Sequence, residues 1–496
     1  MAGRASAPAC APDAARGRVD PGLVVPLLVA LAFLALLAAS VGVDPARGVT
    51  ASTSPYTDEG WNVVNARNFV LFGHWSTDDW NMYLVNLPFS LLEAAWLAVT
   101  GVGIVQARLL VIVAGALGLA VLGGGLRRPL GIPGAALAAA ALGGSALLLY
   151  YGRLAYLEPL VMLWLIVALV ALVGERPSLG TGMVAGLALA LAIATKASAG
   201  FAAGGMLVAV AVVEWRDAGV RRAVTGAVVA LLLAALAWAV VFALPQPAAL
   251  ATDLRIWAPE PLPHTLAELL RRITAYPTRS DGAIPLALPL LVAGAAGLVV
   301  AILRRAALTP SQRRIAAACV GWFAVGMGVL LVVPYRPNRY LVPLLPPLAV
   351  LAGLGFARLV VWMDTRRRGP VAAAACVLAV ALAAPGLALQ VGWVASAPST
   401  LPGVQARIMA IVPPGAAIQG DLAPILAMRA RAVTIVSRPA SQVNAGDLYA
   451  TRGVRWVLTT GPAPAWAPLH RAAWNARTSV LCVSWGPGRT CLYRLP

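Results

Sequence analysis

The sequence predicts a polytopic α-helical membrane protein with a small C-terminal extracytoplasmic α/β domain. Only 11% of the 496 residues are charged and 60% are hydrophobic, whereas charged residues make up about a quarter of soluble domains. Mean hydropathy is +0.81, and the apolar runs have the length that a helix needs to cross about 30 Å of hydrocarbon. Helices are expected for such runs, because backbone groups in lipid must be hydrogen-bonded internally.

The apolar runs predict about eleven transmembrane helices. We expect them at residues 23–42, 104–123, 131–149, 159–173, 180–195, 199–214, 223–243, 284–303, 315–333, 340–361 and 371–394. Arginine clusters occupy alternate connections, as the positive-inside rule expects of cytoplasmic loops. The expected location is therefore the plasma (inner) membrane, with a cytoplasmic N-terminus and the C-terminal domain outside. Residues 1–22, rich in Pro, Ala and Arg, are predicted to form a disordered cytoplasmic tail.

The formal net charge of +19 also raises the possibility of nucleic-acid binding. The arginines occur as short clusters between apolar runs, which is the pattern of membrane topology. We therefore expect membrane lipids, and no nucleic acid, as partners of this surface.

Two outer connections are longer than a link between helices requires. In residues 43–103, the stretches 59–73 and 83–99 have helical periodicity with polar flanks, which predicts helices lying along the membrane interface. Residues 244–283 contain an amphipathic piece around Thr265–Ile273. Long loops of this kind are usually functional or disordered, and the amphipathic pattern favours function.

Residues 395–496 change pattern and predict an α/β domain outside the membrane. Short β-rich runs at 416–420, 433–436, 456–459 and 480–484 alternate with helix-like stretches at 423–430 and 444–451. Cys482 and Cys491 bracket a Gly/Pro turn, as a hairpin disulfide would, and an exported domain lies in an oxidising environment. Two unpaired buried thiols remain the alternative.

The adjacent carboxylates Asp58 and Glu59 are the first candidates for chemistry. The chain has only 19 Asp and Glu against 38 Lys and Arg, and this pair lies at the mouth of the predicted bundle. A carboxylate at such a place is a candidate general base. Lys196 is the only lysine, at an outer turn between two apolar runs. Ionisable groups at membrane depth are functional candidates, and a snorkelling lysine is the alternative.

Further charged residues are predicted at the same outer level. Glu158 and Arg153 lie at an outer helix turn and either pair with each other or contribute to a cavity shared with Asp58 and Lys196. The segment Tyr335–Tyr340 carries Arg336 and Arg339, whose guanidinium groups suit bidentate binding of a phosphate. Interfacial anchoring by aromatic and basic residues explains the same composition.

Metal and nucleotide motifs are absent from the sequence. The three histidines, His74, His264 and His470, are scattered, and there is no Walker loop, dinucleotide fingerprint or HExxH helix. We expect no cofactor and no metal ligands, with a divalent metal as the less favoured possibility.

The order of these motifs resembles the GT-C superfamily of polyprenyl-phosphate-sugar-dependent glycosyltransferases, especially its protein O-mannosyltransferase and lipid A aminoarabinose transferase branch. The resemblance covers most of residues 20–360, and a C-terminal outer domain is common in relatives. Residues 23–394 would then form the catalytic transmembrane domain. The residues that carry it are Asp58-Glu59, Arg108-Leu109, Arg153 with Glu158, Thr195-Lys196, and Arg339-Tyr340 followed by Pro343 and Pro346.

The resemblance implies an inverting glycosyltransferase that moves a sugar from a polyprenyl-phosphate donor to an extracytoplasmic glycan, lipid or protein acceptor. Asp58 would be the catalytic base, and Glu59 would orient it or contact the acceptor. Lys196 and Arg339 would neutralise the donor phosphate, with Tyr340 lining the pocket. Glu158 stands where relatives usually have Asp. Residues Asn86-Leu87-Pro88-Phe89 lack the basic residue that relatives usually show before a proline pair.

Two other classes of function compete with this interpretation. A transporter or flippase of a lipid-linked sugar would generally show internal repeats and broken helices in both halves. No clear repeat is evident, and the large asymmetric first outer loop favours an enzyme. A non-catalytic membrane scaffold whose outer domain binds a partner is the third possibility.

Overall fold

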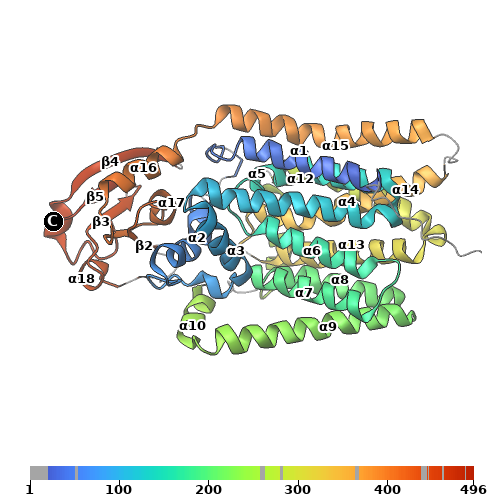
Figure 1. Cartoon of the computed structure of the whole chain (residues 1–496), viewed down its shortest axis with the longest axis horizontal. Helices are drawn as coiled ribbons and strands as arrows, with labels where there is room; N and C mark the ends of the chain where they lie inside the picture. The colour runs from blue at the N-terminus through green and yellow to red at the C-terminus, as the bar shows by residue number, and fades with distance from the viewer. Residues whose placement is uncertain are drawn as a thin grey trace, which may run out of the picture.

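The protein consists of a helical bundle and a C-terminal unit with a five-stranded sheet (Figure 1). The computed structural model describes residues 21–496 except 48, 51–53, 257–262, 280–282, 334, 363–367, 437–443, 445, 461–462 and 486–487. The predicted cytoplasmic tail, residues 1–22, therefore lies almost wholly outside the described residues.

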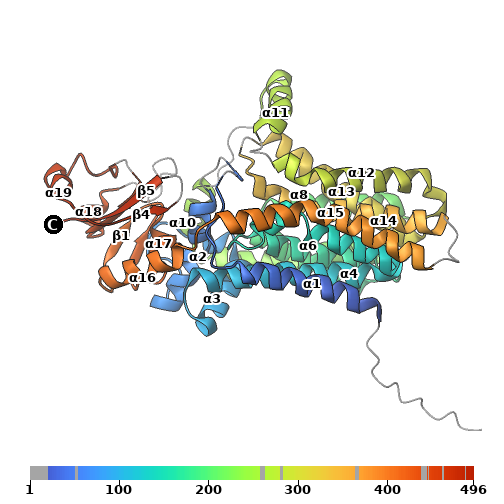
Figure 2. The ribbon, with the colours of Figure 1, turned by 90° about the horizontal axis from the view of Figure 1, so that it is seen from above.

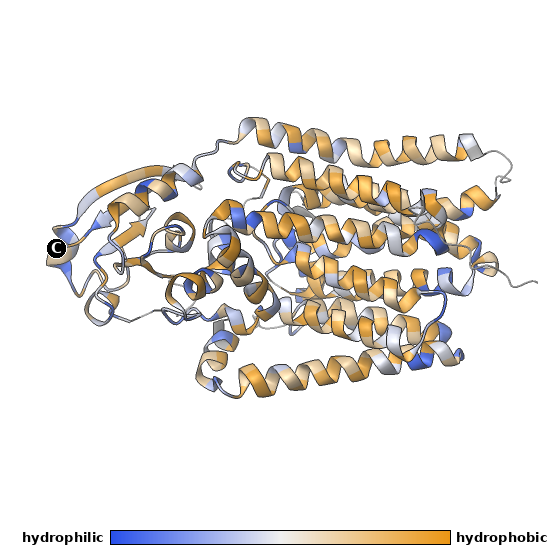
Figure 3. Ribbon diagram, in the orientation of Figure 1, coloured by the Kyte–Doolittle hydropathy of each residue, from blue (hydrophilic) through white to orange (hydrophobic). Residues whose placement is uncertain are grey.

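The bundle is built from apolar helices that run side by side (Figure 1). Among the described residues, seven helices are long and apolar enough to cross a membrane, and shorter apolar helices lie between them. Figure 3 shows the hydrophobic residues along the length of the bundle. The long and shorter helices of the bundle are α1 (Pro21–Ala39), α4 (Ile104–Gly143), α6 (Glu158–Val173), α7 (Leu179–Thr195), α8 (Ala199–Glu214), α9 (Ala218–Trp238), α12 (Ala283–Leu303), α13 (Pro310–Val332), α14 (Leu345–Trp362) and α15 (Arg368–Ser396).

Every predicted membrane span corresponds to one of these helices or to an arm of α4. Gly131 has a φ of 68° inside α4, a left-handed conformation that glycine adopts without a steric penalty. The chain reverses there, so the predicted spans 104–123 and 131–149 are the two arms of α4, and the second is followed by α5 (Ala146–Tyr151).

Small residues allow the helices to pack closely. A Cβ atom added at Gly182 or Gly186 of α7 would lie 1.9 or 2.1 Å from the carbonyl oxygen of Ala223 or Ala227 on α9. This four-residue spacing is the one that brings membrane helices into close contact, where van der Waals packing drives association.

The two connections that are predicted to lie outside fold into helices at one end of the bundle. The first contains α2 (Ser54–Phe72), η1 (Met82–Leu84) and α3 (Leu87–Thr100), which correspond to the predicted helical stretches. The second contains α10 (Pro247–Ile256) and α11 (Leu266–Arg279) after the π-helical turn η2 (Ala239–Ala243). Figure 2 shows α11 projecting from the bundle, while α10 packs against η1 and the start of α3. Two 3₁₀ segments, η3 (Arg305–Ala307) and η4 (Asn338–Leu344), flank α13.

The C-terminal unit begins with α16 (Leu401–Ile411) and contains a mixed sheet. Its strands are ordered β2-β1-β3-β5-β4; β1 is parallel to β2 and β3, and β5 is antiparallel to β3 and β4. The strand β5 is not among the predicted strands, because its sequence has few apolar residues. The elements are β1 (Ala417–Gln419), α17 (Ala423–Leu426), β2 (Val433–Ile435), α18 (Leu448–Thr451), β3 (Trp456–Thr459), α19 (Arg471–Asn475), β4 (Thr478–Trp485) and β5 (Gly488–Arg494).

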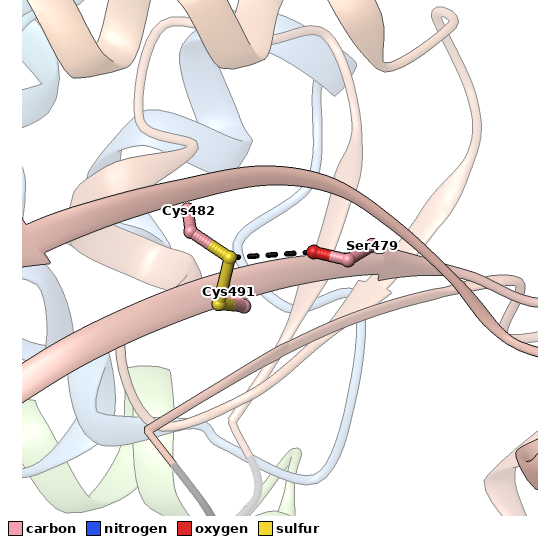
Figure 4. The surroundings of a disulfide bond; sticks show 3 residues. All are labelled: Ser479, Cys482 and Cys491. Atoms are coloured by element: carbon pink, nitrogen blue, oxygen red, sulfur yellow. Dashed lines mark hydrogen bonds between the residues drawn. A yellow bond between two sulfur atoms is a disulfide. The ribbon is translucent and has the colours of Figure 1, made fainter.

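Cys482 and Cys491 face each other across the β4–β5 hairpin and form a disulfide bond, as expected from their placement (Figure 4). Ser479 lies beside the bond, with its hydroxyl oxygen 3.3 Å from the sulfur of Cys482. The cross-link holds together a two-stranded edge of the sheet.

Arg67 of α2 attaches the C-terminal unit to the first outer loop. Its guanidinium is fully buried and donates to the carbonyl oxygens of Met428 and Ala432, at 2.8 and 2.9 Å. It also donates to the carbonyls of Ala427 and Ala430 and to the side-chain oxygen of Asn68. One side chain therefore binds four carbonyls of the turn after α17, of which that of Ala427 also accepts the backbone N–H of Ala430 at 3.0 Å.

Further polar contacts reinforce this junction. Asp44 accepts hydrogen bonds from the backbone N–H groups of Thr400 and Leu401, at 2.9 and 3.1 Å. The indole of Trp61 donates to the carbonyl of Asp421 at 2.9 Å. A Cβ at Gly60 would lie 2.5 Å from the backbone nitrogen of Ile425, so α2 and α17 are in direct backbone contact.

Replacing Arg67 with Met should lower the free energy of unfolding by about 3 kcal/mol, because buried carbonyls lose a charged donor. Thermal unfolding of the purified protein in detergent, followed by tryptophan fluorescence, measures the change. Arg452→Met is the matched control, since Arg452 is exposed and contacts Asp79 at 3.5 Å. Equal unfolding midpoints for the two variants would show that Arg67 does not hold the junction.

Candidate active site

Asp58 and Arg339 meet at the junction of α2 and η4. Asp58 is 8% exposed and Arg339 is 7% exposed. The carboxylate oxygen Oδ2 of Asp58 lies 2.8 Å from Nη2 of Arg339. The hydroxyl of Thr57 donates to Oδ1 of Asp58 at 3.0 Å. Both oxygens of the candidate base are therefore positioned by neighbours.

Glu158 and Lys196 continue this arrangement on the other side of Arg339. Oε1 of Glu158, at the start of α6, lies 3.4 Å from Nε of Arg339. The same oxygen accepts a hydrogen bond from the ammonium of Lys196, which follows α7. Asp58, Arg339, Glu158 and Lys196 thus form a chain of alternating charges, called the site cluster below. The structure brings these four predicted residues together from four separate elements.

Aromatic rings surround the two cations. The Lys196 ammonium lies 3.7 Å from the ring centre of Tyr340. The guanidinium of Arg339 lies 5.4 to 5.8 Å from the ring centres of Tyr156, Tyr335 and Tyr340. Cation–π contacts of this kind strengthen when the cation is shielded from water. Tyr156 is not among the predicted site residues, although it stands two positions before Glu158.

Three buried polar atoms of the site lack a hydrogen-bond partner among the described residues. They are the hydroxyl of Tyr156, Oε2 of Glu158 and Nη1 of Arg339. Unpaired buried polar atoms are costly and rare in folded proteins. A polar ligand with both acceptor and donor atoms would satisfy all three.

Glu59 faces away from the site cluster and pairs with Arg108 of α4. Both side chains are fully buried, and the pair is bidentate, with N–O distances of 2.8 and 2.7 Å. Glu59 also accepts the backbone N–H of Ala155 at 2.8 Å. With its oxygens used in this way, Glu59 is placed to fix α2 in position rather than to react.

Two predicted arginines lie outside the site cluster. Arg153 does not pair with Glu158; it donates to the carbonyls of Val43 and Asp44, at 2.7 and 2.9 Å. Arg336 donates to the carbonyl of Arg272 at 2.9 Å, which ties the start of η4 to α11. Both arginines are close in sequence to site residues but point toward backbone carbonyls.

An apolar cavity begins at Lys196 and Tyr340. It lies between α6, α8, α13 and η4 and is small and half open, with a volume of about 40 Å³. Apart from Lys196, Ser198 and Tyr340, its lining side chains are apolar. They include Val161, Leu165, Phe201, Val329 and Leu344. A cation at one end and hydrocarbon along the rest match a lipid with a charged head.

No group of three or more His, Cys, Asp or Glu side chains that could hold a metal ion occurs in the described part of the chain. The charges of the site cluster are supplied by carboxylates, one guanidinium and one ammonium. The residues present offer cationic stabilisation of an anion from the protein itself.

Solved structures with this architecture are known, whereas no family model and no curated protein matches the chain. ArnT from Cupriavidus metallidurans in the apo state superposes with a TM-score of 0.62 at 18% identity, covering 95% of this chain and 97% of that one. The same protein bound to undecaprenyl phosphate gives a TM-score of 0.61 at 17% identity, covering 95% and 97% of the two chains.

Two larger proteins share the same fold. The arabinofuranosyltransferase AftD from Mycobacteria matches with a TM-score of 0.50 at 17% identity, over 95% of this chain and 40% of that one. The oligosaccharyltransferase AglB from Archaeoglobus fulgidus matches with a TM-score of 0.50 at 12% identity, over 88% and 69%. All three are membrane glycosyltransferases of one superfamily. The chain therefore has the GT-C fold, as its sequence motifs predict.

Proposed function

We propose that the protein is an inverting glycosyltransferase that moves a sugar from a polyprenyl-phosphate donor to an acceptor outside the cytoplasm, with Asp58 as general base. The observation that carries the proposal is the site cluster, whose Lys196 also lines an apolar cavity. The phosphate would lie beside Lys196 and Arg339, and the lipid tail would start at this cavity and continue along the apolar outside of the bundle. ArnT, which has this fold, binds undecaprenyl phosphate.

The unpaired atoms of the site match the parts of such a donor. Nη1 of Arg339 and the hydroxyl of Tyr156 are donors for phosphate oxygens, and Oε2 of Glu158 accepts from a hydroxyl or amine of the sugar. Charge-assisted hydrogen bonds to phosphate are among the stronger polar contacts in proteins. The site cluster and Tyr156 therefore offer complementary groups for both the phosphate and the sugar of the donor.

The chemistry proceeds by direct displacement. Asp58 takes the proton from an acceptor hydroxyl or amine, whose electron pair forms the new bond to the anomeric carbon. The bond from that carbon to the phosphate oxygen breaks on the opposite face, so configuration inverts. The lipid phosphate leaves with the electron pair, and the charges of Lys196 and Arg339 stabilise it.

The ion pair between Asp58 and Arg339 couples donor binding to activation of the base. Nη2 of Arg339 lies 2.8 Å from the carboxylate of Asp58, so the guanidinium is shared between the base and any phosphate bound beside it. A donor phosphate competes for the same guanidinium and thereby loosens its hold on Asp58. The base becomes effective only when a donor is present, which limits wasteful hydrolysis.

Replacing Asp58 with Asn should lower the rate of glycosyl transfer by about 10²- to 10⁴-fold, the usual contribution of a general base. Donor binding should be retained, because the phosphate contacts of Lys196 and Arg339 remain. The assay uses the purified protein in nanodiscs with a radiolabelled polyprenyl-phosphate-sugar pool and follows release of free lipid phosphate. A transporter or scaffold would release none.

Asp79→Asn is the matched control for this measurement. Asp79 is an exposed carboxylate of the same outer loop, and it contacts Arg452 of the C-terminal unit. Its replacement should leave turnover unchanged. If the Asp58→Asn variant transfers sugar at the wild-type rate, Asp58 is not the general base. The assignment as a glycosyltransferase would then still stand.

Replacing Lys196 with Gln should weaken binding of polyprenyl phosphate by about tenfold or more, since one charge-assisted hydrogen bond contributes about 1.5–3 kcal/mol. Binding is measured by titration of the lipid phosphate into protein held in neutral detergent. The matched control is Arg336→Gln. It also removes one positive charge, but from a side chain that donates to the carbonyl of Arg272, and it should change binding by less than about threefold. Equal losses in both variants would contradict the placement of the phosphate.

A further inference from the structure

The C-terminal unit has an excess of positive charge that the site cluster does not use. Residues 397–496 contain two carboxylates, Asp421 and Asp447, and neither lysine nor glutamate. Its described arginines are exposed, except for the half-buried Arg477. The ten arginines of this region are Arg407, Arg429, Arg431, Arg438, Arg452, Arg455, Arg471, Arg477, Arg489 and Arg494.

Three of these arginines gather at one end of the sheet. Arg494 ends β5 and pairs in register with Trp456 at the start of β3 and with Thr478 at the start of β4. Arg455 and Arg477 immediately precede those two strand starts. Arg455, Arg477 and Arg494 therefore lie at the same end of three neighbouring strands, and they are called the tip cluster below.

The tip cluster lies far from the membrane-spanning bundle. The C-terminus, two residues after Arg494, marks the tip of the molecule opposite the bundle in both views, and α18 and α19 lie beside it (Figures 1 and 2). If the bundle spans the membrane as its apolar helices predict, the sheet-containing unit extends away from the membrane and the tip cluster lies on its far side.

Aromatic rings hold these guanidinium groups in place. Arg455 lies 4.4 Å from the ring centre of Tyr449, and Arg477 lies 4.3 Å from that of Trp474. Arg494 lies 5.9 Å from the ring centre of Trp456. Arg455 and Arg477 also donate through Nη1 to the carbonyls of Tyr449 and Trp474, at 3.3 and 2.7 Å. The remaining N–H groups of a stacked guanidinium can contact a carboxylate or phosphate. Because its position is already restricted, less conformational entropy is lost on binding.

Negative charge near the tip cluster is small. The carboxylate of Asp447, which caps α18, lies 2.6 Å from Nε2 of His470, and this hydrogen bond lowers the pKa of Asp447 below its usual value. Asp79 of the first loop contacts Arg452 at 3.5 Å. The terminal carboxylate of Pro496, two residues after Arg494, is a further negative charge at this end of the sheet. Both side-chain carboxylates have partners, and within the described part of the chain neither forms an ion pair with an arginine of the tip cluster.

We propose that the tip cluster binds an anionic glycan polymer of the cell envelope, through the carboxylate or phosphate groups that its sugars carry. The choice of a glycan rests on the proposed extracytoplasmic location of this unit. The disulfide between Cys482 and Cys491, in the adjacent hairpin, belongs to oxidising compartments, where nucleic acid is not a resident partner. In the same topology, the C-terminal unit separates the tip cluster from the membrane that the bundle spans. Binding at the tip would keep the enzyme close to envelope polymer without occupying the site cluster.

The test measures binding of the full chain, in nanodiscs of neutral phosphatidylcholine, to polygalacturonate by biolayer interferometry. Binding should weaken by about tenfold or more between about 50 and about 200 mM salt, as expected for several released counterions. Fully methyl-esterified polygalacturonate, which has the same sugar backbone without the charges, should not bind. This comparison uses the wild-type protein, and equal binding of the two polymers would overturn the proposal.

A triple variant, Arg455→Gln with Arg477→Gln and Arg494→Gln, should weaken binding by about tenfold or more, given the usual strength of exposed charge pairs. The matched control, Arg407→Gln with Arg429→Gln and Arg431→Gln, removes the same charge from α16 and from the side where Arg431 contacts Leu71 of α2. It should change binding by less than about threefold at moderate salt, because separated exposed charges are screened.

Equal losses in the two triple variants would show that binding depends only on net charge and not on the position of the arginines. That result would overturn the assignment of the tip cluster. Tighter binding to phosphatidylglycerol vesicles or to single-stranded DNA than to polygalacturonate would overturn the choice of partner. Because the assay contains neither sugar donor nor acceptor, its failure is distinguishable from failure of the proposed glycosyl transfer.

Discussion

The buried ion pair between Glu59 and Arg108 is the interaction on which the rest of the site depends. It joins α2 to α4, while Arg108 also donates to the carbonyls of Val41 and Val43 after α1. Breaking a buried pair leaves an uncompensated charge and costs about 3–5 kcal/mol. The orientation of α2 is therefore fixed. Successive helical residues point about 100° apart, so with Glu59 held toward Arg108, Asp58 turns toward Arg339.

In the site cluster, too, each charge has a neighbour of the opposite sign, but not every polar atom is paired. Four charges at the edge of the apolar bundle alternate in sign, so that each has a neighbour of the opposite charge. Unlike the Glu59–Arg108 pair, this chain leaves buried polar atoms without partners. Low polarity strengthens contacts with a charged ligand for the same reason that it penalises unpaired charge. The first pair is thus suited to holding structure, and the second group to exchanging partners with a substrate.

The C-terminal unit helps to position the site, because it contacts α2. Arg67, Asp44 and Trp61 attach this unit to the first outer loop, so α2 is held from both sides, by the bundle and by the sheet-containing unit. Such two-sided support gives a functional side chain a defined position. The opposite end of the sheet is distant from these contacts (Figure 1). Contacts made there by another molecule would leave the geometry around Asp58 undisturbed.

Much of this protein is determined by single residues and local patterns. Apolar length predicts the spans, the spacing around the Gly/Pro turn predicts the disulfide of Cys482 and Cys491, and the scarcity of acid and lysine singles out Asp58 and Lys196. Partner choice is different: that Glu59 binds Arg108, and that Arg153 and Arg336 bind carbonyls, depends on the directions in which packed helices present their side chains. The strand β5 also owes its place to pairing with β3 and β4 rather than to its own composition. The sequence alone therefore determined which charges the apolar chain carries, because each is expensive in lipid. Only the tertiary structure decided which of them neutralise one another, because pairing requires helices distant in sequence to pack side by side.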